Sequence, residues 1–162
     1  MMRLWAVLFF LLAACPILVR AEPVNHWSVG FHRLSFLDPL DEQPMGAIAF
    51  YPSSDAEGIS KIGGYALHDL ATSLARKGFV VVAVLHPGDN YKDHSRLGTL
   101  SNLYGRPMQI SAAISATLAD PELSVYVHDD EVGVIGYSAG GETALILAGA
   151  QPDLDRLRRY CQ

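Results

Sequence analysis

The chain has few cysteines and little positive charge. Its 162 residues include only two cysteines, Cys15 and Cys161. Because Cys15 lies in an apolar leader, the mature chain would keep one thiol and no internal disulfide. Lysine and arginine number 12 against 17 aspartate and glutamate residues, which gives a net charge of −5. This balance leaves no basic surplus to neutralise phosphates, and it argues against binding to nucleic acids or anionic membranes.

The composition lacks the low hydrophobicity of a disordered chain, and no low-complexity tract interrupts it. Apolar residues make up 50% of the sequence and charged residues 18%. These proportions are typical of a packed globular protein. Without its leader the chain keeps about 141 residues, enough for one ordinary domain. We therefore expect a single domain over residues 22–162.

Residues 1–21 have the pattern of a signal peptide. Arg3 supplies a positive start, residues 4–12 form an unbroken apolar run, and residues 19–21 have the small-residue spacing of a signal-peptidase site. We expect cleavage after residue 21 and export to the periplasm or the medium. Two alternatives stay open. One is an uncleaved anchor, although the run is short for a membrane span, and the other is a lipidated Cys15, which would attach the protein to a membrane.

Apolar periodicity predicts two strands and a first helix in the amino-terminal half. Alternating apolar residues favour strands near residues 29–36 and at 47–51, which a proline-containing turn would join as a hairpin. Helical spacing followed by Gly78 predicts a helix over residues 65–77.

Two further runs, residues 79–85 and 132–135, are apolar on both faces, as central parallel strands are. Between them a helix is expected to open at Pro107 and to stop at Asp120. Strand, helix and strand in this order imply a parallel pair with a right-handed crossover. The sequence therefore predicts an α/β fold in which helices cover both faces of a mostly parallel sheet.

The motif Gly-x-Ser-x-Gly occupies residues 136–140, directly after the second of these runs. In a tight strand-to-helix turn its serine, Ser138, takes strained dihedral angles and projects its hydroxyl above the carboxyl end of the sheet. Gly136 and Gly140 would remove clashes with the strand and the helix. The amide of Ala139 would then donate to a developing oxyanion. The motif thus predicts a nucleophile and half of an oxyanion hole.

A phosphate loop or a dinucleotide-binding turn is a competing interpretation of these glycines. A phosphate loop ends in Gly-Lys-Ser or Gly-Lys-Thr, and a dinucleotide site needs Gly-x-Gly-x-x-Gly. Gly133, Gly136 and Gly140 fit neither spacing. No cofactor is therefore expected, while a glycine-rich turn with an incidental serine stays open.

The longer run of residues 132–141 that contains the motif and four other segments, residues 49–52, 86–90, 104–107 and 157–161, add to the pattern. Together with the serine motif they resemble the exported, dienelactone hydrolase-like branch of the α/β-hydrolase superfamily. The resemblance covers most of the mature chain, and the serine motif is its most specific part. It implies an α/β-hydrolase-type three-layer sandwich in which a serine nucleophile acts on a small-molecule ester or lactone.

The chain departs from that family pattern in two places. The family's second oxyanion donor follows a strand that ends in Ser-His-Gly, but here residues 62–66 lead straight into the first predicted helix. The family's catalytic order is serine, acid, histidine, yet Asp153 and Asp155 follow Ser138 and no histidine does. We therefore expect an incomplete member that lacks the carboxyl-terminal part and turns over weakly by itself.

His86 is the best-placed stand-in base among the upstream histidines. The carboxyl end of its strand should share a rim with the serine turn, although anchoring of its loop is the simpler role. With Asp89, Asp93 and His94 it forms a cluster of potential metal ligands, but the spacing carries no metal signature and no metal is expected. The remaining histidines lack any motif context, and they are His26, His32, His68 and His128.

Two functions of different classes follow from these observations. In the first, the chain belongs to a carboxylic ester hydrolase in which Ser138 attacks the substrate carbonyl. In the second, it is a non-catalytic exported remnant or binding domain that keeps the turn for packing. The missing base and the missing oxyanion strand favour the second function, and the serine motif favours the first.

Overall fold

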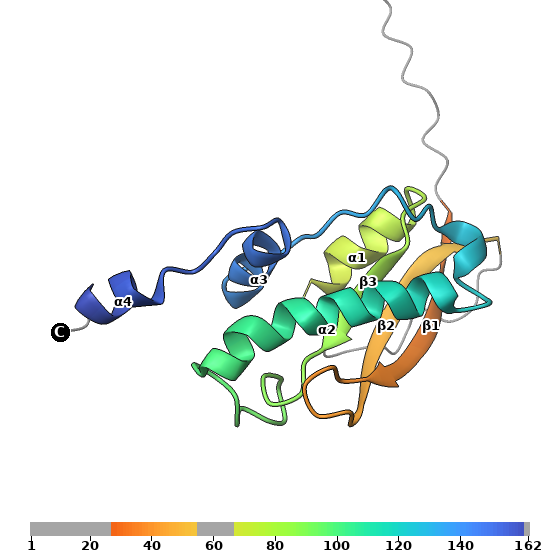
Figure 1. The fold of residues 1–162 in the computed structure, drawn as a ribbon. Coiled ribbons are helices and arrows are strands. Elements are labelled where there is room, and N and C mark those ends of the chain that lie inside the picture. Colours follow the sequence, from red (N-terminus) through yellow and green to blue (C-terminus); the bar gives the residue numbers. More distant parts are fainter. Residues whose placement is uncertain (1–26, 55–66, 161–162) are drawn as a thin grey trace, which may run out of the picture.

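The computed structural model describes residues 27–54 and 67–160 (Figure 1). The predicted signal peptide, both cysteines and residues 62–66 lie outside the described residues. No helix in the described part of the chain is long and apolar enough to cross a lipid bilayer. In chain order the elements are β1 (Ser28–Leu37), β2 (Pro44–Ser53), α1 (His68–Ala75), β3 (Val81–Leu85), α2 (Leu100–Ala119), η2 (Ser124–Tyr126), α3 (Ala139–Leu147) and α4 (Leu154–Tyr160).

The three strands form one antiparallel sheet with the order β1-β2-β3. β1 and β2 pair in continuous register up to the turn between Leu37 and Pro44, so the predicted hairpin is confirmed. β3 pairs with β2, again antiparallel. The predicted mostly parallel α/β-hydrolase-type sheet is therefore wrong. The parallel pair required a strand at residues 132–135 beside β3, and the structure forms no strand there.

α1 and α2 cover opposite faces of this sheet (Figure 1). One core cluster joins β1 and β2 to α1, and it consists of Val29, Ile48, Phe50, Ala71 and Ala75. A second cluster joins the same strands to the segment after α2, and it consists of Leu34, Ala47, Ala49 and Leu123. Because successive side chains of a strand point to opposite faces, β2 serves both clusters with alternate residues.

The apolar alternation of β1 slips by one residue between Phe31 and Leu34. The pairing register with β2 contains no bulge at this point. Val29 and Phe31 therefore face α1, whereas Leu34 and Phe36 face the α2 side. The slip therefore marks the point along β1 where the apolar side chains change from the face that packs on α1 to the opposite face.

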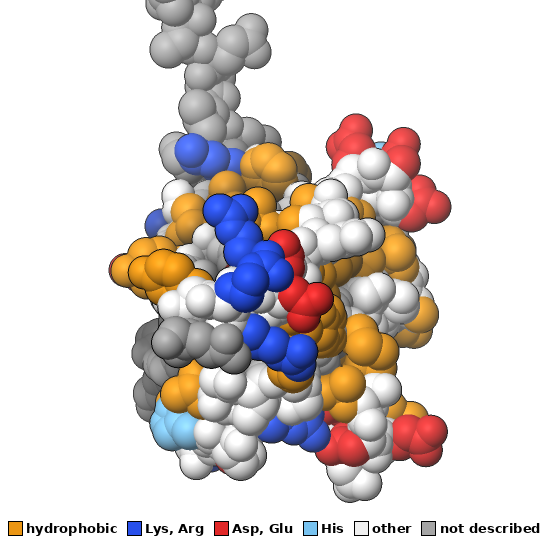
Figure 2. Space-filling model, turned by 60° about the vertical axis from the view of Figure 1, so that its left-hand side comes forward, with side chains coloured by type: hydrophobic (Ala, Val, Ile, Leu, Met, Phe, Trp, Pro, Cys, Tyr) orange, Lys and Arg blue, Asp and Glu red, His pale blue; other side chains and the backbone are white. Residues whose placement is uncertain are grey.

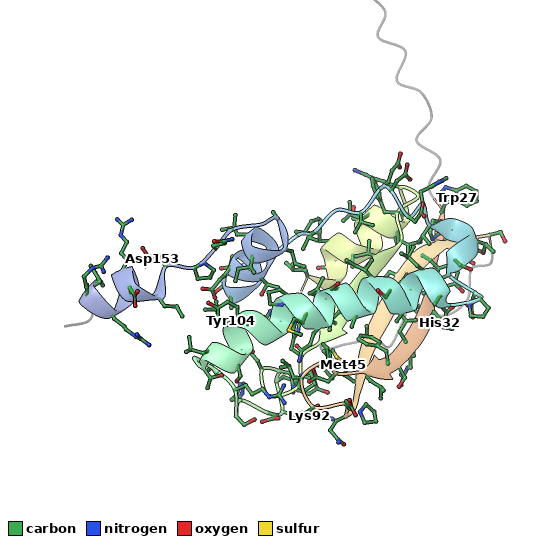
Figure 3. All side chains as sticks on the ribbon, in the orientation of Figure 1. Trp27, His32, Met45, Lys92, Tyr104 and Asp153 are labelled. Carbon is green, nitrogen blue, oxygen red and sulfur yellow. The ribbon has the colours of Figure 1, made fainter. Side chains whose placement is uncertain are left out.

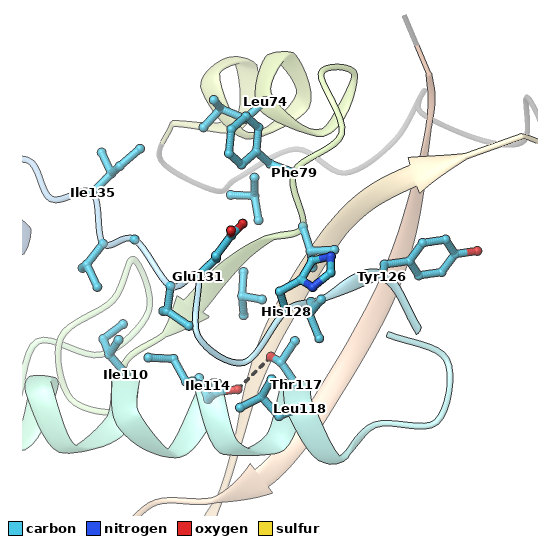
Figure 4. Close-up of a pocket in the computed structure, with 18 of the residues that line it drawn as sticks. Leu74, Phe79, Ile110, Ile114, Thr117, Leu118, Tyr126, His128, Glu131 and Ile135 are labelled. Atoms are coloured by element: carbon cyan, nitrogen blue, oxygen red, sulfur yellow. Dashed lines mark hydrogen bonds between the residues drawn. The ribbon is translucent and has the colours of Figure 1, made fainter. Parts of the chain in front are cut away.

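Residues 132–135 have no strand partner among the described residues. Val132, Val134 and Ile135 are 51%, 41% and 64% exposed, and none of them forms a backbone hydrogen bond with β3. They line an open apolar groove of about 660 Å³ with residues of β3, α1 and α2 (Figure 4). A strand that is apolar on both faces is stable where both faces are covered. Here residues 132–135 border the open groove, so their apolar side chains are not covered in this way. β3 is accordingly a half-buried edge strand rather than a central one.

α2 begins earlier than predicted. The side chain of Thr99 accepts a hydrogen bond from the Asn102 amide at 3.2 Å and caps the helix. Pro107 lies inside the helix, so the prediction that it opens the helix is wrong. The predicted end at Asp120 is confirmed. α3 lies beside the amino-terminal part of α2, and α4 extends beyond that end of α2 and away from the sheet (Figure 1).

Candidate functional site

Residues 136–141 form a tight turn that leads into α3. Ser138 caps the helix with φ 53° and ψ −123°, a backbone conformation that side chains rarely adopt. The amides of Gly140 and Gly141 close the turn by donating to the carbonyls of Tyr137 and Ser138, both at 2.9 Å. Ser138 is exposed, and its hydroxyl forms no capping hydrogen bond with the helix. The turn therefore presents the hydroxyl to solvent at the start of a helix.

The two glycines of the motif have different surroundings. A Cβ on Gly136 would overlap the carbonyl of Gly140 and lie 2.6 Å from the amide nitrogen of Gly141. A Cβ on Gly140 would meet nothing within 4 Å. The predicted clash at Gly140 is therefore wrong, because no described residue covers that side of the first turn of α3. The close backbone approach of the turn depends on Gly136.

The backbone amide of Ala139 is available to donate a hydrogen bond to an anion. It is the first residue of α3, where backbone N–H groups have no partner within the helix, and it donates to no other described residue. The amino-terminal end of a helix also attracts negative charge. An oxyanion that develops beside Ser138 would accept this hydrogen bond. A second oxyanion donor is not predicted from the sequence, and residues 62–66, which lead into the first helix, lie outside the described residues.

Arg106 of α2 connects this turn to the loop after β3. Its Nε donates to the Thr143 hydroxyl at 3.1 Å, and its Nη1 donates to the Asp89 carboxylate at 2.5 Å. Asn102 donates to the same carboxylate oxygen at 2.8 Å. Desolvation raises the pKa of Asp89, but the hydrogen bonds from Asn102 and Arg106 outweigh it and hold the pKa below its ordinary value. Asp89 is therefore ionised at neutral pH and anchors Arg106.

His86 lies directly after β3 and is 7% exposed. Its Nδ1 is 2.6 Å from the side-chain oxygen of Gln109, whose amide nitrogen donates to Asp38 at 3.0 Å. Because an ionised carboxylate only accepts, Gln109 must turn its NH₂ to Asp38 and its oxygen to His86. This assigns the proton of neutral His86 to Nδ1 and leaves the Nε2 lone pair unprotonated.

The backbone of His86 anchors its loop. Asn90 Nδ2 donates to the His86 carbonyl at 2.8 Å, and the Asp89 amide donates to it at 3.2 Å. No hydrogen bond joins the His86 ring to Ser138. The structure thus shows the anchoring role and does not bring the stand-in base into contact with the nucleophile.

We expect the stability of the fold to fall as His86 becomes protonated. Burial lowers the pKa of His86, and this effect outweighs the hydrogen bond with Gln109, which raises it. The unfolded chain therefore takes up this proton first, at an ordinary pKa near 6.5, and the free energy of unfolding falls as the pH drops below that value. The loss approaches about 1.4 kcal/mol per pH unit at most.

Urea unfolding of the wild type and of His86→Gln between pH 7.5 and pH 5 measures this effect. The difference between the two slopes isolates His86 from the other histidines. Identical slopes in the two proteins would contradict the prediction.

The other described histidines form no hydrogen bond with Ser138. Both ring nitrogens of His32 lie 2.9 Å from a carboxylate, one from Asp120 and one from Glu122. Arg106 and Asp120 are about 21 Å apart along the axis of α2 at a rise of about 1.5 Å per residue. Figure 3 accordingly shows His32 at the opposite end of α2 from Tyr104. His68 packs edge-on against a phenylalanine ring of β2.

The aspartates that the sequence offers as candidate acids or metal ligands interact with other groups of the protein. Asp93 accepts a hydrogen bond from the Ser95 amide at 3.0 Å, and Asp153 accepts one from the Arg156 amide at 2.8 Å. Asp155 pairs with an arginine of α4, and Figure 2 shows Lys and Arg side chains next to acidic ones at this end of the molecule. Within the described ranges, no three metal-ligating side chains gather as a candidate metal site.

Comparisons with known proteins point to no relative. No family model matches the chain, and no match was found among curated proteins or solved structures. The functional argument therefore depends on the geometry of the Ser138 turn and its supports.

Arg106 and Thr143 are the site residues that sequence reasoning missed. In the sequence, Arg106 belongs to the resembling segment 104–107, and Asp89 belongs to segment 86–90 and to the cluster of potential metal ligands. No local pattern signals a contact between Arg106 and Thr143, because the two residues lie on different helices.

Proposed function

We propose that this chain acts as a serine hydrolase of ester or lactone bonds, similar to the exported dienelactone hydrolase-like branch, with Ser138 as nucleophile. The observation that carries the proposal is the positive φ of Ser138, an exposed residue at the start of α3. Such backbone strain costs about 1–3 kcal/mol and clusters at catalytic sites. A turn that served packing alone would be more stable with glycine at this position.

The reaction that fits this turn is acyl transfer. Ser138 Oγ attacks the carbonyl carbon while its proton passes to a base, and the carbonyl electrons move to oxygen, which the Ala139 amide stabilises. The tetrahedral intermediate then expels the alkoxide, which takes the proton back from the base. A water molecule repeats the attack on the acyl-enzyme, releases the acid and restores the serine.

Among the described residues, His86 has the protonation state that a general base for Ser138 requires. Burial keeps its ring neutral, and the Gln109 contact leaves Nε2 free to accept a proton. Because no hydrogen bond links this ring to Ser138, the proposal depends on the serine turn and not on His86.

A non-catalytic exported domain that keeps the turn is the second candidate. It is favoured by one observation, the lack of any hydrogen bond from a described side chain to the Ser138 hydroxyl. A serine without a base is a poor nucleophile at neutral pH.

Covalent labelling with a fluorophosphonate probe distinguishes the two candidates. We expect one adduct per chain, which peptide mass spectrometry locates on Ser138, because the probe mimics the tetrahedral intermediate and uses the same oxyanion donor. Folded protein that remains unlabelled after long incubation would refute the hydrolase proposal.

Two variants control the experiment. Ser138→Ala should remove the label and leave the melting temperature nearly unchanged, since the side chain is exposed. Ser138→Gly should also remove the label and should be at least as stable as the wild type, because glycine adopts the positive φ without strain. Labelling of either variant would place the reactive group elsewhere.

We also propose that the protein is exported to the periplasm or the medium, on the strength of the leader pattern in residues 1–21. Lipidation at Cys15 is the alternative route, and it would leave the protein on a membrane. Amino-terminal sequencing of the mature protein separates the two, because cleavage after residue 21 and cleavage before Cys15 leave different first residues.

A further inference from the structure

Helix α3 buries few side chains that could hold it in place. Thr143 is its one buried residue, at 5% exposure. The helix packs against α2, while Tyr137 before it is 81% exposed and Leu145 within it is 65% exposed. Apolar burial therefore supplies little of the force that orients the Ser138 turn.

Thr143 connects the turn to a charged anchor. Its hydroxyl donates to the Ala139 carbonyl at 3.0 Å and accepts the hydrogen bond from Arg106 Nε at 3.1 Å. The directions are unambiguous, since an arginine only donates and a carbonyl only accepts. Ala139 is the residue whose amide would serve the oxyanion, so the hydroxyl holds the peptide unit next to that donor.

Arg106 is itself held rigidly. Its side chain and that of Asp89 are 16% and 11% exposed, and the ion pair between them is reinforced by Asn102. Charge-assisted hydrogen bonds of this kind are stronger than neutral ones. The chain of contacts thus runs from the loop after β3 through Arg106 and Thr143 to the first turn of α3.

We propose that Arg106, anchored on Asp89, is a positioning residue that fixes the first turn of α3 through the Thr143 hydroxyl and so aims Ser138 and the Ala139 amide. The inference rests on the proposed hydrolase function of Ser138. Two features of the geometry support it: both hydrogen bonds converge on the one buried residue of α3, and the hydroxyl reaches the carbonyl of the residue after the nucleophile.

The test compares rates of fluorophosphonate labelling in Arg106→Met, Thr143→Val and Thr143→Ser. Methionine removes the charge, valine keeps the shape of threonine without its hydroxyl, and serine keeps the hydroxyl. Because a displacement of about 1 Å at a reacting centre costs about 100-fold in rate, we expect labelling to slow at least about tenfold in the first two variants. Thr143→Ser should stay within about twofold of the wild type.

Thr117→Val is the matched control. Thr117 is also 5% exposed, and its hydroxyl donates to the carbonyl four residues earlier at 2.7 Å, as that of Thr143 does. It lies near the far end of α2 from Arg106. We expect its labelling rate to equal that of the wild type. If Arg106→Met labels at the wild-type rate, or if Thr117→Val slows labelling as much as Thr143→Val, the proposal is overturned.

Amide hydrogen exchange separates this inference from the hydrolase proposal. If the wild type takes no label, the hydrolase proposal fails, and exchange in α3 decides the rest. Faster exchange at residues 140–143 in Arg106→Met and Thr143→Val, but not in Thr117→Val, would still support the anchor. Unchanged exchange in the first two variants would refute it.

Discussion

Replacing Gly136 by alanine is expected to displace the Ser138 turn at the start of α3 and to slow covalent labelling of Ser138 about 100-fold. The new Cβ would overlap the carbonyl of Gly140 and crowd the amide of Gly141. These are backbone atoms, which no side-chain rotation can move aside, so the turn must open. Overpacking of this kind costs about 1–3 kcal/mol, and a displacement of the serine by about 1 Å lowers the labelling rate about 100-fold. Amide exchange across α3 and the rate of fluorophosphonate labelling measure the two effects.

Gly140→Ala is the matched control for this prediction. It adds the same methyl group to the same turn, but the added Cβ meets nothing within 4 Å. Alanine also favours a helix over glycine by about 1 kcal/mol. We expect wild-type labelling and unchanged or slower exchange in α3. Equal damage from the two substitutions would show that the turn does not have the geometry described above.

Replacing Asp38 by alanine is expected to cost about 3–5 kcal/mol of unfolding free energy, the usual effect of breaking a buried ion pair. Asp38 is fully buried. Its carboxylate accepts hydrogen bonds from the Leu40 amide, from Arg96 and from Gln109, at 3.0, 3.2 and 3.0 Å. Its removal leaves these three donors without an acceptor and releases the Gln109 side chain that holds the His86 ring. Urea unfolding at pH 7 measures the loss.

Asp41→Ala provides the comparison. Asp41 binds the same Arg96 side chain at 2.7 Å, but its carboxylate is 40% exposed. Exposed ion pairs contribute about 0–1 kcal/mol, so this variant should be nearly as stable as the wild type. If both variants lose the same free energy of unfolding, the hydrogen bonds of the buried Asp38 contribute no more to stability than the exposed ion pair of Asp41.

The hairpin and the end of α2 were readable from the sequence because they depend on neighbouring residues. Alternation of apolar residues and a proline-containing turn predicted β1 and β2, and Asp120 predicted where α2 stops. The start of α2 differs from the prediction because Thr99 caps the helix eight residues before Pro107. A proline inside a helix and a proline at its start look alike in a sequence.

The parallel sheet failed for a non-local reason. Both apolar runs, in β3 and at residues 132–135, have the composition of buried strands. Whether such a run becomes a strand depends on what covers its two faces. Around Val134 and Ile135 the described residues leave an open groove, and the pairing with β3 does not form.

The sequence by itself determined the Ser138 motif, since the spacing of its glycines allows a close backbone turn with a serine at its apex. Only the tertiary structure showed that, of the two motif glycines, Gly136 is the one that steric contacts require, that His86 is buried in a network apart from Ser138, and that Arg106 joins α3 to the loop after β3. The physical reason is the separation along the chain over which each kind of interaction acts. Backbone sterics act between residues a few positions apart, whereas burial, ion pairing and the covering of a strand depend on which distant segments come together.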